Sequence, residues 1–442
     1  MDSLLFAPAH ELATAIRQRH VSASEVVEAH LAQIARHNPT VNAIVALDED
    51  GTKQRAQAAD AALARGEVWG PLHGVPITLK DVHDTAGVRS TMGHGSLLTR
   101  IATEDSVVAA RLKAAGSVLV GKTNAEIYPN NPFGQTHSPW DIERTPGISS
   151  SGAAAALAAG MTPLDIGSDV GGSIIEPAHY CGVYGMRPTE RRVPLGTFPT
   201  EPVRLWRCMQ VLGPMARSVN DLRLALQLIA GPHRMDSEVP PVVWGTAPRL
   251  ALSDLRIAWT ATFPGTRIAA DIRAAIEAFA HELARRGGRV QHCLPEVDLV
   301  QQAQLLIRLT ELVEGSFAAT PPSLGDYFTA LSQRDMFVAR WERFFDAWDV
   351  LVCPAAEITA PRLTDTVLFV DGEEIPPGSG VAPHQLSPAT GQPAIVIPLA
   401  KDRNTLPIGV QLIGRRWDDE RLLAIAELFS DVTGGFQRPP GY

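Results

Sequence analysis

The sequence lacks the features that mark metal-binding, disulfide-linked or membrane-spanning chains. Its 442 residues include only four cysteines. These are widely scattered and form no Cys-x-x-Cys pair, so neither a zinc site nor a disulfide framework is indicated. The longest apolar stretch, residues 153–161, is far too short to span a bilayer. The N-terminus has no basic region followed by an apolar core, as a signal peptide would. We therefore expect a cytoplasmic protein with no metal, no other cofactor and no membrane partner.

An excess of basic residues is also missing. The formal net charge is −9, whereas a nucleic-acid-binding protein usually presents a basic face, so nucleic acid is disfavoured as a partner. Hydrophobic content of 45% and charged content of 20% are those of an ordinary globular chain. A length prior of roughly 150 residues per domain would allow about three domains. No Gly/Ser-rich linker or charge block divides the chain, however, so we expect one domain, residues 1–442.

Helical and strand patterns alternate along the chain. Ser22-x-x-Glu25 is a capping-box signature for a helix that runs to about residue 36. Strands that alternate with helices favour an α/β layered fold on a parallel or mixed sheet. The other predicted helices are 50–65, 105–115, 153–159, 219–230, 269–286 and 419–429, and the predicted strands are 76–79, 118–121, 161–166, 393–399 and 407–413.

Residues 354–386 form an irregular, proline-containing segment. Within it, Asp371-Gly372 lies between two short apolar runs, which predicts a small hairpin. Irregular segments of this length are often lids or binding loops. Two interpretations are open: a lid over the site, or a surface excursion without a role.

Glycine-rich runs surround three side chains that can do chemistry, namely Lys80, Ser149 and Ser173. Glycine lets main-chain N–H groups crowd together, and such donors can stabilise an oxyanion. A lysine acts as a base only when burial lowers its pKa, and Lys80 follows an apolar strand that leads inward. These parts suit an enzyme that attacks an acyl carbon with serine. The three runs read GPLHGVPITLKD (70–81), TPGISSSGAAAALAAG (145–160) and DIGSDVGGSIIEPAHYCG (165–182).

Other readings of these runs are weaker. The serine run lacks the order of a phosphate-binding loop, and no G-x-S-x-G elbow occurs. For each of His73, His83 and His179 alone, a structural hydrogen bond is a better interpretation than catalysis. Carboxylates beside tight turns, here Asp81, Asp169 and Glu176, more often bind main-chain N–H groups than act as bases.

The chain resembles the amidase-signature family of Ser–Ser–Lys hydrolases over most of its length. By motif position, the resemblance makes Ser173 the nucleophile, Lys80 the base, and Ser149 a bridging serine with a cis peptide bond. It also implies a single α/β/α domain, in which helices flank a twisted mixed β-sheet, and frequent homodimers. The matching motifs are GVPITLKD (74–81), GKTNAE (121–126), PGISSSG (146–152), GSDVGGSI (167–174), CGVYGMRPT (181–189), GPMARSVNDL (213–222), DVLVCP (349–354) and LPIGVQLIGR (406–415).

The resemblance further implies an acyl-enzyme mechanism. The main-chain N–H groups of Val170, Gly171 and Gly172, with that of Ser173, are expected to receive the oxyanion. The chain departs from the family at three positions. Ile148 and Ser151 stand where glycine is usual, and Ile175 stands where an arginine is common and is thought to support the loop. Another brace is therefore expected here.

The departures leave the substrate class open. The segment 127–133 brings Tyr128 and Phe133 close to the bridging serine, and we predict that both bind substrate, although they could instead pack the core. An aromatic pocket suits hydrophobic or aryl amides and carbamates (urethanes), cleaved at the C–N bond. One alternative is an amidotransferase A-type subunit that supplies ammonia from glutamine, against which the departures weigh. The other is a non-catalytic scaffold, which would have no reason to retain Lys80, Ser149 and Ser173.

Overall fold

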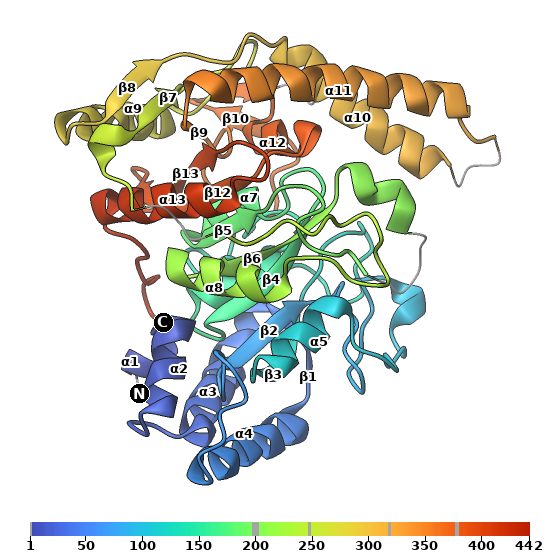
Figure 1. Ribbon diagram of the computed structural model, residues 1–442, viewed down its shortest axis with the longest axis vertical. Coiled ribbons are helices and arrows are strands. Elements are labelled where there is room, and N and C mark those ends of the chain that lie inside the picture. The colour runs from blue at the N-terminus through green and yellow to red at the C-terminus, as the bar shows by residue number, and fades with distance from the viewer. Residues whose placement is uncertain (1, 197–202, 246–248, 317–319, 376–379) are drawn as a thin grey trace.

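A mixed sheet runs through the middle of the molecule (Figure 1). The computed structural model describes residues 2–196, 203–245, 249–316, 320–375 and 380–442. Within them the large sheet has eight strands in the order β4-β6-β5-β12-β13-β9-β7-β8. Neighbours are antiparallel except β7, which runs parallel to both β9 and β8. The strands are β4 (Leu164–Asp169), β5 (Tyr184–Arg187), β6 (Val211–Ala216), β7 (Arg256–Trp259), β8 (Arg289–His292), β9 (Val350–Pro354), β12 (Ala394–Lys401) and β13 (Pro407–Ile413).

A smaller sheet of three strands in the described part lies beside β4. It has the order β1-β3-β2, with β1 (Ile44–Leu47) antiparallel and β2 (Pro76–Lys80) parallel to β3 (Val118–Thr123). Thr78 of β2 donates a 2.6 Å hydrogen bond to Asp165 of β4. This contact joins the two sheets and brings the end of β2, which carries Lys80, next to the end of β4.

Helices cover both faces of the large sheet, which gives the expected α/β/α layers (Figure 1). On one face lie α8 (Val219–Ile229), α9 (Ala270–Arg285) and α13 (Asp419–Thr433), and on the other lie α6 (Ser151–Ala158) and α7 (Ile175–Cys181).

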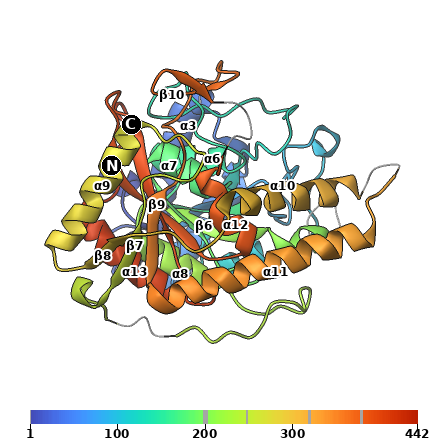
Figure 2. The same cartoon turned by 90° about the horizontal axis from the view of Figure 1, so that it is seen from above.

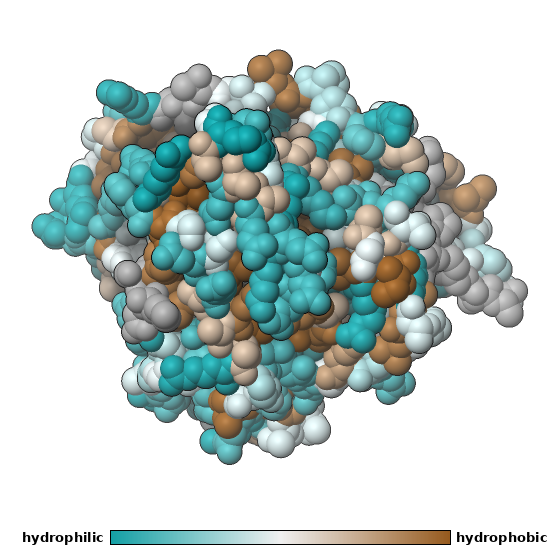
Figure 3. Space-filling model, turned by 90° about the horizontal axis from the view of Figure 1, so that it is seen from below, coloured by the Kyte–Doolittle hydropathy of each residue, from teal (hydrophilic) through white to brown (hydrophobic). Residues whose placement is uncertain are grey.

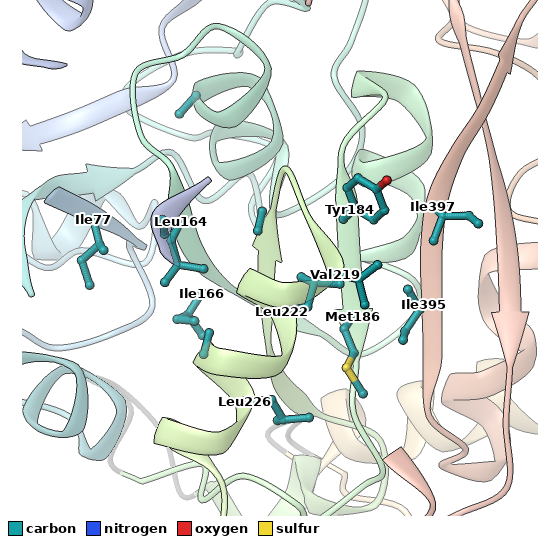
Figure 4. Close-up of a cluster of buried hydrophobic side chains, with 14 of the residues drawn as sticks. Ile77, Leu164, Ile166, Tyr184, Met186, Val219, Leu222, Leu226, Ile395 and Ile397 are labelled. Carbon is teal, nitrogen blue, oxygen red and sulfur yellow. The ribbon is translucent and has the colours of Figure 1, made fainter. Parts of the chain in front are cut away.

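The alternation of side chains along β12 explains why both faces of the sheet need a cover. Successive strand residues point to opposite faces, so Ile395 and Ile397 pack with Leu222 and Leu226 of α8, as Figure 4 shows. Val396 belongs instead to the apolar cluster formed with α6 and α7. Each fully buried aliphatic side chain contributes about 1.5–3 kcal/mol relative to an exposed one.

Helix α6 is built mainly from small residues, most of them alanine, and every residue of it is buried. Small side chains allow close approach of neighbouring backbones. At Gly152, for example, an added Cβ would lie 2.4 Å from the main-chain nitrogen of Asn124. The sequence of α6 therefore lets the serine run that precedes it sit deep in the molecule.

Two long helices, α10 (Leu299–Gly315) and α11 (Leu324–Ala347), pack against each other and on α12 (Leu386–Thr390) at the end of the molecule away from the N-terminal helices (Figures 1 and 2). The sequence patterns did not predict them. The remaining helices are α1 (Asp2–Leu5), α2 (Ala9–Arg17), α3 (Ala23–Val41), α4 (Glu49–Ala64), α5 (Val107–Ala114) and the short 3₁₀ turns η1 (Gly95–Leu97), η2 (Val203–Cys208), η3 (Leu252–Asp254) and η4 (Pro383–Gln385).

The predicted helices and strands are confirmed, with bounds that shift by a few residues. Ser22 and Glu25 form the predicted capping box at the start of α3. Asp371 and Gly372, at φ of 50° and 86°, form the turn between β10 (Leu368–Val370) and β11 (Glu373–Ile375), which pair antiparallel. Residues 376–379 of the irregular segment lie outside the described residues.

The outer surface mixes polar side chains with scattered apolar ones on the face that Figure 3 shows. Among the described residues, no helix is both long and apolar enough to cross a membrane. The four cysteines are free thiols, and Cys181, Cys208 and Cys353 are buried.

Candidate active site

Lys80, Ser149 and Ser173 come together where β2 and β4 end. Lys80 is the last residue of β2, Ser149 precedes α6, and Ser173 lies in the turn between β4 and α7. Ser149 and Ser173 line one cavity of about 900 Å³. Lys80 is fully buried behind Ser149. Three segments that are distant in sequence thus present the three side chains to one place.

The Lys80 side chain is surrounded by serine oxygens. Its Nζ lies 2.6 Å from Ser149 Oγ, 3.0 Å from Ser150 Oγ and 2.9 Å from Ser168 Oγ. Burial lowers the pKa of Lys80 to about 7, although the carboxylates of Asp169 and Asp165 act to raise it. A lysine of this kind is largely neutral slightly above pH 7 and can then accept a proton from Ser149.

Polar side chains of the sheet fix the main chain that carries Lys80. Asp165 accepts hydrogen bonds from Thr78 Oγ1 at 2.6 Å and from the Lys80 N–H at 3.1 Å. Burial raises the pKa of Asp165 to about 6, against the effect of these hydrogen bonds. Asp81 accepts from the Thr91 N–H at 3.0 Å, so it binds main chain, as predicted for a carboxylate beside a turn.

The Asp169 carboxylate binds the main chain of the turn that carries Ser173. Its Oδ1 accepts from the Gly172 N–H at 2.9 Å, and its Oδ2 accepts from the Ile174 N–H at 2.7 Å. Arg187, also fully buried, pairs with Asp169 at 3.0 Å. Gly172 has φ of 105°, in the region that favours glycine.

These hydrogen bonds change the expectation for the oxyanion donors. The Gly172 N–H already donates to the Asp169 carboxylate, so the prediction that Gly172 binds the oxyanion is wrong. The N–H groups of Val170, Gly171 and Ser173 are donated to no other described residue. These three N–H groups stay the predicted donors.

A second correction concerns the peptide bonds around Ser149. The described residues contain no cis peptide bond, whereas the resemblance implied one at Ser149. With a trans backbone, Ser149 Oγ already lies 2.6 Å from Lys80 Nζ. Its hydroxyl makes no hydrogen bond to that of Ser173 in the described contacts. Catalytic hydrogen bonds often tighten only when substrate binds.

The cavity wall contains many apolar side chains. Tyr128 lines it, and its ring meets that of His94 edge to face at 4.9 Å. Helix α10 forms another side of the wall, which the sequence analysis missed because it did not predict this helix. The lining residues besides the serines and Tyr128 are Val82, Met92, Glu126, Ile127, Pro129, Ile148, Val170, Gly171, Trp206, Gln210, Leu306, Ile307, Thr310, Glu311, Glu314 and Gln385.

Phe133 does not line this cavity, so its predicted role is corrected. It borders a separate hollow with Asn42 and His137. Asn42 Nδ2 donates to the Phe133 carbonyl at 2.7 Å, and the Arg89 guanidinium lies over the ring, 5.1 Å from its centre. The turn after Tyr128 therefore directs the second aromatic away from the serines.

The irregular segment 354–386 covers little of the cavity. Of its described residues, only Gln385 is part of the cavity wall. The β10–β11 hairpin instead contacts the start of α9, where the Asp371 carboxylate accepts from the Ala270 N–H at 3.1 Å. Helix α10 contributes Leu306, Ile307, Thr310, Glu311 and Glu314 to the wall.

The charged side chains of the cavity are acidic. Glu126, Glu311 and Glu314 line it, and no lysine, arginine or histidine occurs in the described wall. Glu126 accepts a 2.6 Å hydrogen bond from Ser151 Oγ, so the serine that departs from the family pattern orients a wall carboxylate. No group of three or more His, Cys, Asp or Glu that could hold a metal occurs among residues with described placement.

The three histidines near the motifs have structural contacts. Each ring is hydrogen-bonded to a main-chain carbonyl. The distances are 2.9 Å from His83 to Ile166, 3.1 Å from His73 to Ala59 and 3.1 Å from His179 to Ile358. The structural interpretation is therefore the better one for each.

Ile175 is fully buried in the apolar cluster that includes Ile174 and Ala178. Replacing it with arginine should lower the free energy of unfolding by about 3–5 kcal/mol, because the new charge would be buried without a partner. Ile175→Met, which keeps volume and polarity, should cost less than about 1.5 kcal/mol. Chemical denaturation of both variants measures the difference. An unchanged stability for Ile175→Arg would mean that Glu176 turns to pair with it.

Comparison with known proteins extends over nearly the whole chain. The family model described as amidase matches residues 25–315 and 311–423. The A subunit of the glutamyl-tRNA(Gln) amidotransferase of Roseiflexus sp. (strain RS-1) is 30% identical, over 96% of this chain and 96% of its own length.

Solved structures agree with this match. A protein from a vestigial complex that bears on the origins of an s-triazine catabolic enzyme superposes with a TM-score of 0.85 at 29% identity, covering 98% of this chain and 99% of that chain. A bacterial aryl acylamidase of the amidase signature enzymes superposes with a TM-score of 0.84 at 25% identity, covering 97% and 96%.

Proposed function

Because this chain belongs to the amidase signature family, we propose that it hydrolyses the C–N bonds of amides and carbamates that carry hydrophobic or aryl groups. The observation that carries the proposal is that the buried Lys80 Nζ lies 2.6 Å from Ser149 Oγ. Ser149 and Ser173 both line the same cavity. A neutral buried amine next to two serines is a base for nucleophilic catalysis.

The reaction begins with proton transfer. Ser149 passes its proton to neutral Lys80 and takes the proton of Ser173, whose Oγ attacks the carbonyl carbon. The carbonyl oxygen becomes an oxyanion that accepts hydrogen bonds from the free N–H groups of the turn, those of Val170, Gly171 and Ser173. The Asp169 carboxylate holds the turn in the shape that aims these donors.

The tetrahedral intermediate then loses its amine. Ser149 gives a proton to the leaving nitrogen and regains one from protonated Lys80, the C–N bond breaks, and the acyl group stays on Ser173. Water, deprotonated through the same relay, attacks this ester and releases the acid. For a carbamate, an alkoxycarbonyl group takes the place of the acyl group on Ser173 and leaves in the same way.

The cavity walls support uncharged substrates. The wall includes Tyr128, Ile127, Ile148 and Met92, and apolar walls favour apolar groups. Free glutamine carries an α-carboxylate that would find no described cation in the wall, and it has no apolar group to pack against the apolar side chains. The likeness in fold to an aryl acylamidase supports an aryl substrate.

A second candidate function is that of the glutamine-dependent A-type component of an amidotransferase, because such a protein is 30% identical over 96% of the chain. An A-type component would need partner proteins and would prefer glutamine. Full hydrolytic activity of the purified chain alone, without glutaminase activity, would exclude this candidate.

A matched substrate series tests the preference. We expect kcat/KM for butyryl p-nitroanilide to exceed that for succinyl p-nitroanilide, which differs by one terminal carboxylate, and that for glutamine by at least about 100-fold, or about 2.7 kcal/mol. An aryl carbamate should also be hydrolysed. The Ser173→Ala protein, purified in the same way, controls for contaminating hydrolases. A preference for glutamine or for the succinyl substrate would contradict the proposal.

A further inference from the structure

A fully buried arginine, Arg187, lies behind the turn that carries the proposed nucleophile. It is the last residue of β5, and its side chain forms a 3.0 Å ion pair with that of Asp169, which is also fully buried. The Arg187 Nε is buried without a hydrogen-bond partner among the described residues. Taking a charge pair out of water costs free energy, and apolar residues of similar volume are often as stabilising. Stability alone therefore does not explain the pair.

The Arg187 guanidinium joins two segments of the site. Its Nη1 donates to the main-chain carbonyl and to the Oδ1 of Asp169, each at 3.0 Å. Its Nη2 donates to the Met209 carbonyl at 2.7 Å. Met209 lies between Trp206 and Gln210, which both line the cavity. The guanidinium thus connects the turn after β4 to a segment of the cavity wall.

The Asp169 carboxylate passes this constraint to the turn. Its Oδ1 binds both Arg187 and the Gly172 N–H, and its Oδ2 accepts from the Ile174 N–H. The main-chain N–H groups on both sides of Ser173 are therefore fixed to one carboxylate. Because the guanidinium binds Oδ1 and the Asp169 main-chain carbonyl together, it also fixes the rotation of that carboxylate.

We propose that Arg187 is a positioning residue that sets the Ser173 hydroxyl and the oxyanion donors through Asp169. Its contact with Met209 anchors this arrangement to the cavity wall. Arg187 is then the brace expected where Ile175 replaces an arginine, and it comes from β5 rather than from the turn itself. This inference rests on the proposed hydrolase function, because it concerns the placement of the nucleophile of that reaction.

Arg187→Lys is the first test, because it keeps the positive charge but loses the rigid fork that binds two partners at fixed positions. Arg187 and Asp169 are not part of the described cavity wall, so substrate binding should persist. We expect kcat to fall about 10- to 100-fold, as for a displacement of about 1 Å, with KM changed less than about threefold. The rate at which a fluorophosphonate labels Ser173 should fall by the same factor.

Asp169→Asn tests the other half of the pair. The amide keeps one acceptor oxygen, but its nitrogen cannot accept from a main-chain N–H, so one side of Ser173 is released. The loss of kcat should be at least as large as in Arg187→Lys. The double variant should lose no more than the worse single variant, because both residues act on the turn through one carboxylate.

Arg217→Lys is a matched control. Arg217 is also buried and donates to main-chain carbonyls, among them those of Leu157 at 2.9 Å and Thr162 at 2.7 Å. None of its described hydrogen bonds reaches the Ser173 turn or the cavity wall. This variant should therefore keep wild-type kcat, even where its melting temperature falls.

The outcomes are decisive in either direction. A fall in kcat and in labelling rate for Arg187→Lys, at unchanged KM and with wild-type kcat in Arg217→Lys, supports the proposal. It is overturned by unchanged kcat in Arg187→Lys, by a rise in KM alone, by additive losses in the double variant, or by an equal loss in Arg217→Lys. If Arg187→Lys does not fold, Asp169→Asn decides by the same criteria, and failure of both to fold would assign the pair to stability and overturn the proposal. Wild-type protein that neither hydrolyses an amide or carbamate nor reacts with the fluorophosphonate would instead refute the proposed function.

Discussion

Replacing Ser173 with alanine should leave a folded protein whose kcat is lower by about 10⁴-fold or more, because loss of a nucleophile in a serine triad removes covalent catalysis altogether. Ser173 lies in a turn that Asp169 holds through main-chain N–H groups. Since its side chain makes none of these bonds, the alanine variant should keep the melting temperature of the wild type. Steady-state hydrolysis of an acyl anilide and thermal unfolding measure the two quantities.

Covalent labelling tests the identity of the nucleophile directly. A fluorophosphonate should label the wild-type protein at Ser173, and peptide mass spectrometry locates the label. Ser387→Ala is a matched control, because this serine is also buried and its hydroxyl has no partner among the described residues; it should keep activity and labelling. Labelling at another serine, together with activity in Ser173→Ala, would refute the assignment of the nucleophile.

The second large effect concerns Lys80. Burial lowers the pKa of its ammonium group to about 7. Below that pH the group is protonated and cannot accept a proton, so kcat/KM should fall about tenfold per pH unit as the pH drops below 7. Above pH 8 it should reach a plateau, well before the ordinary lysine pKa of about 10.4. A profile that rises only near pH 10 would contradict the role of Lys80.

Two substitutions of Lys80 separate charge from basicity. Lys80→Arg keeps a permanent positive charge, and Lys80→Met keeps a similar length without a base. Both should lose about 10³-fold or more of kcat, and the residual activity should no longer depend on pH near 7. Because methionine needs no hydrogen-bond partner in a buried place, Lys80→Met should fold. Substantial activity in either variant would exclude a neutral lysine as the base.

Much of the local structure could be predicted because its cause is local. The Ser22 and Glu25 side chains cap α3 through contacts three residues apart, and Asp371-Gly372 reverses the chain by its own dihedral angles. Lys80 ends a strand in which all five residues are buried. Its burial beside Ser149 follows from that strand and from the alanine helix that places the serine run.

Predictions failed where a neighbour in space or a competing hydrogen bond decided the outcome. Gly172 offers an N–H in a glycine-rich turn, but the Asp169 carboxylate takes it; an aspartate three residues earlier was the signal. Phe133 is close to Tyr128 in sequence. The Asn42 side chain nevertheless hydrogen-bonds the Phe133 carbonyl, and Phe133 lies at a separate hollow. The hairpin at Asp371 was predicted correctly, but its position against α9 rather than over the cavity was not.

The sequence by itself determined the reactive groups, the turns that present them and those helices and strands with a clear local pattern, because these depend on residues adjacent in the chain. Only the tertiary structure decided what surrounds them. Helix α10, more than 100 residues from either serine, forms part of the cavity wall, and the His384 ring packs on the α-carbon of Gly172. Such contacts depend on how apolar faces pack in three dimensions, which the period of a helix or a strand does not encode.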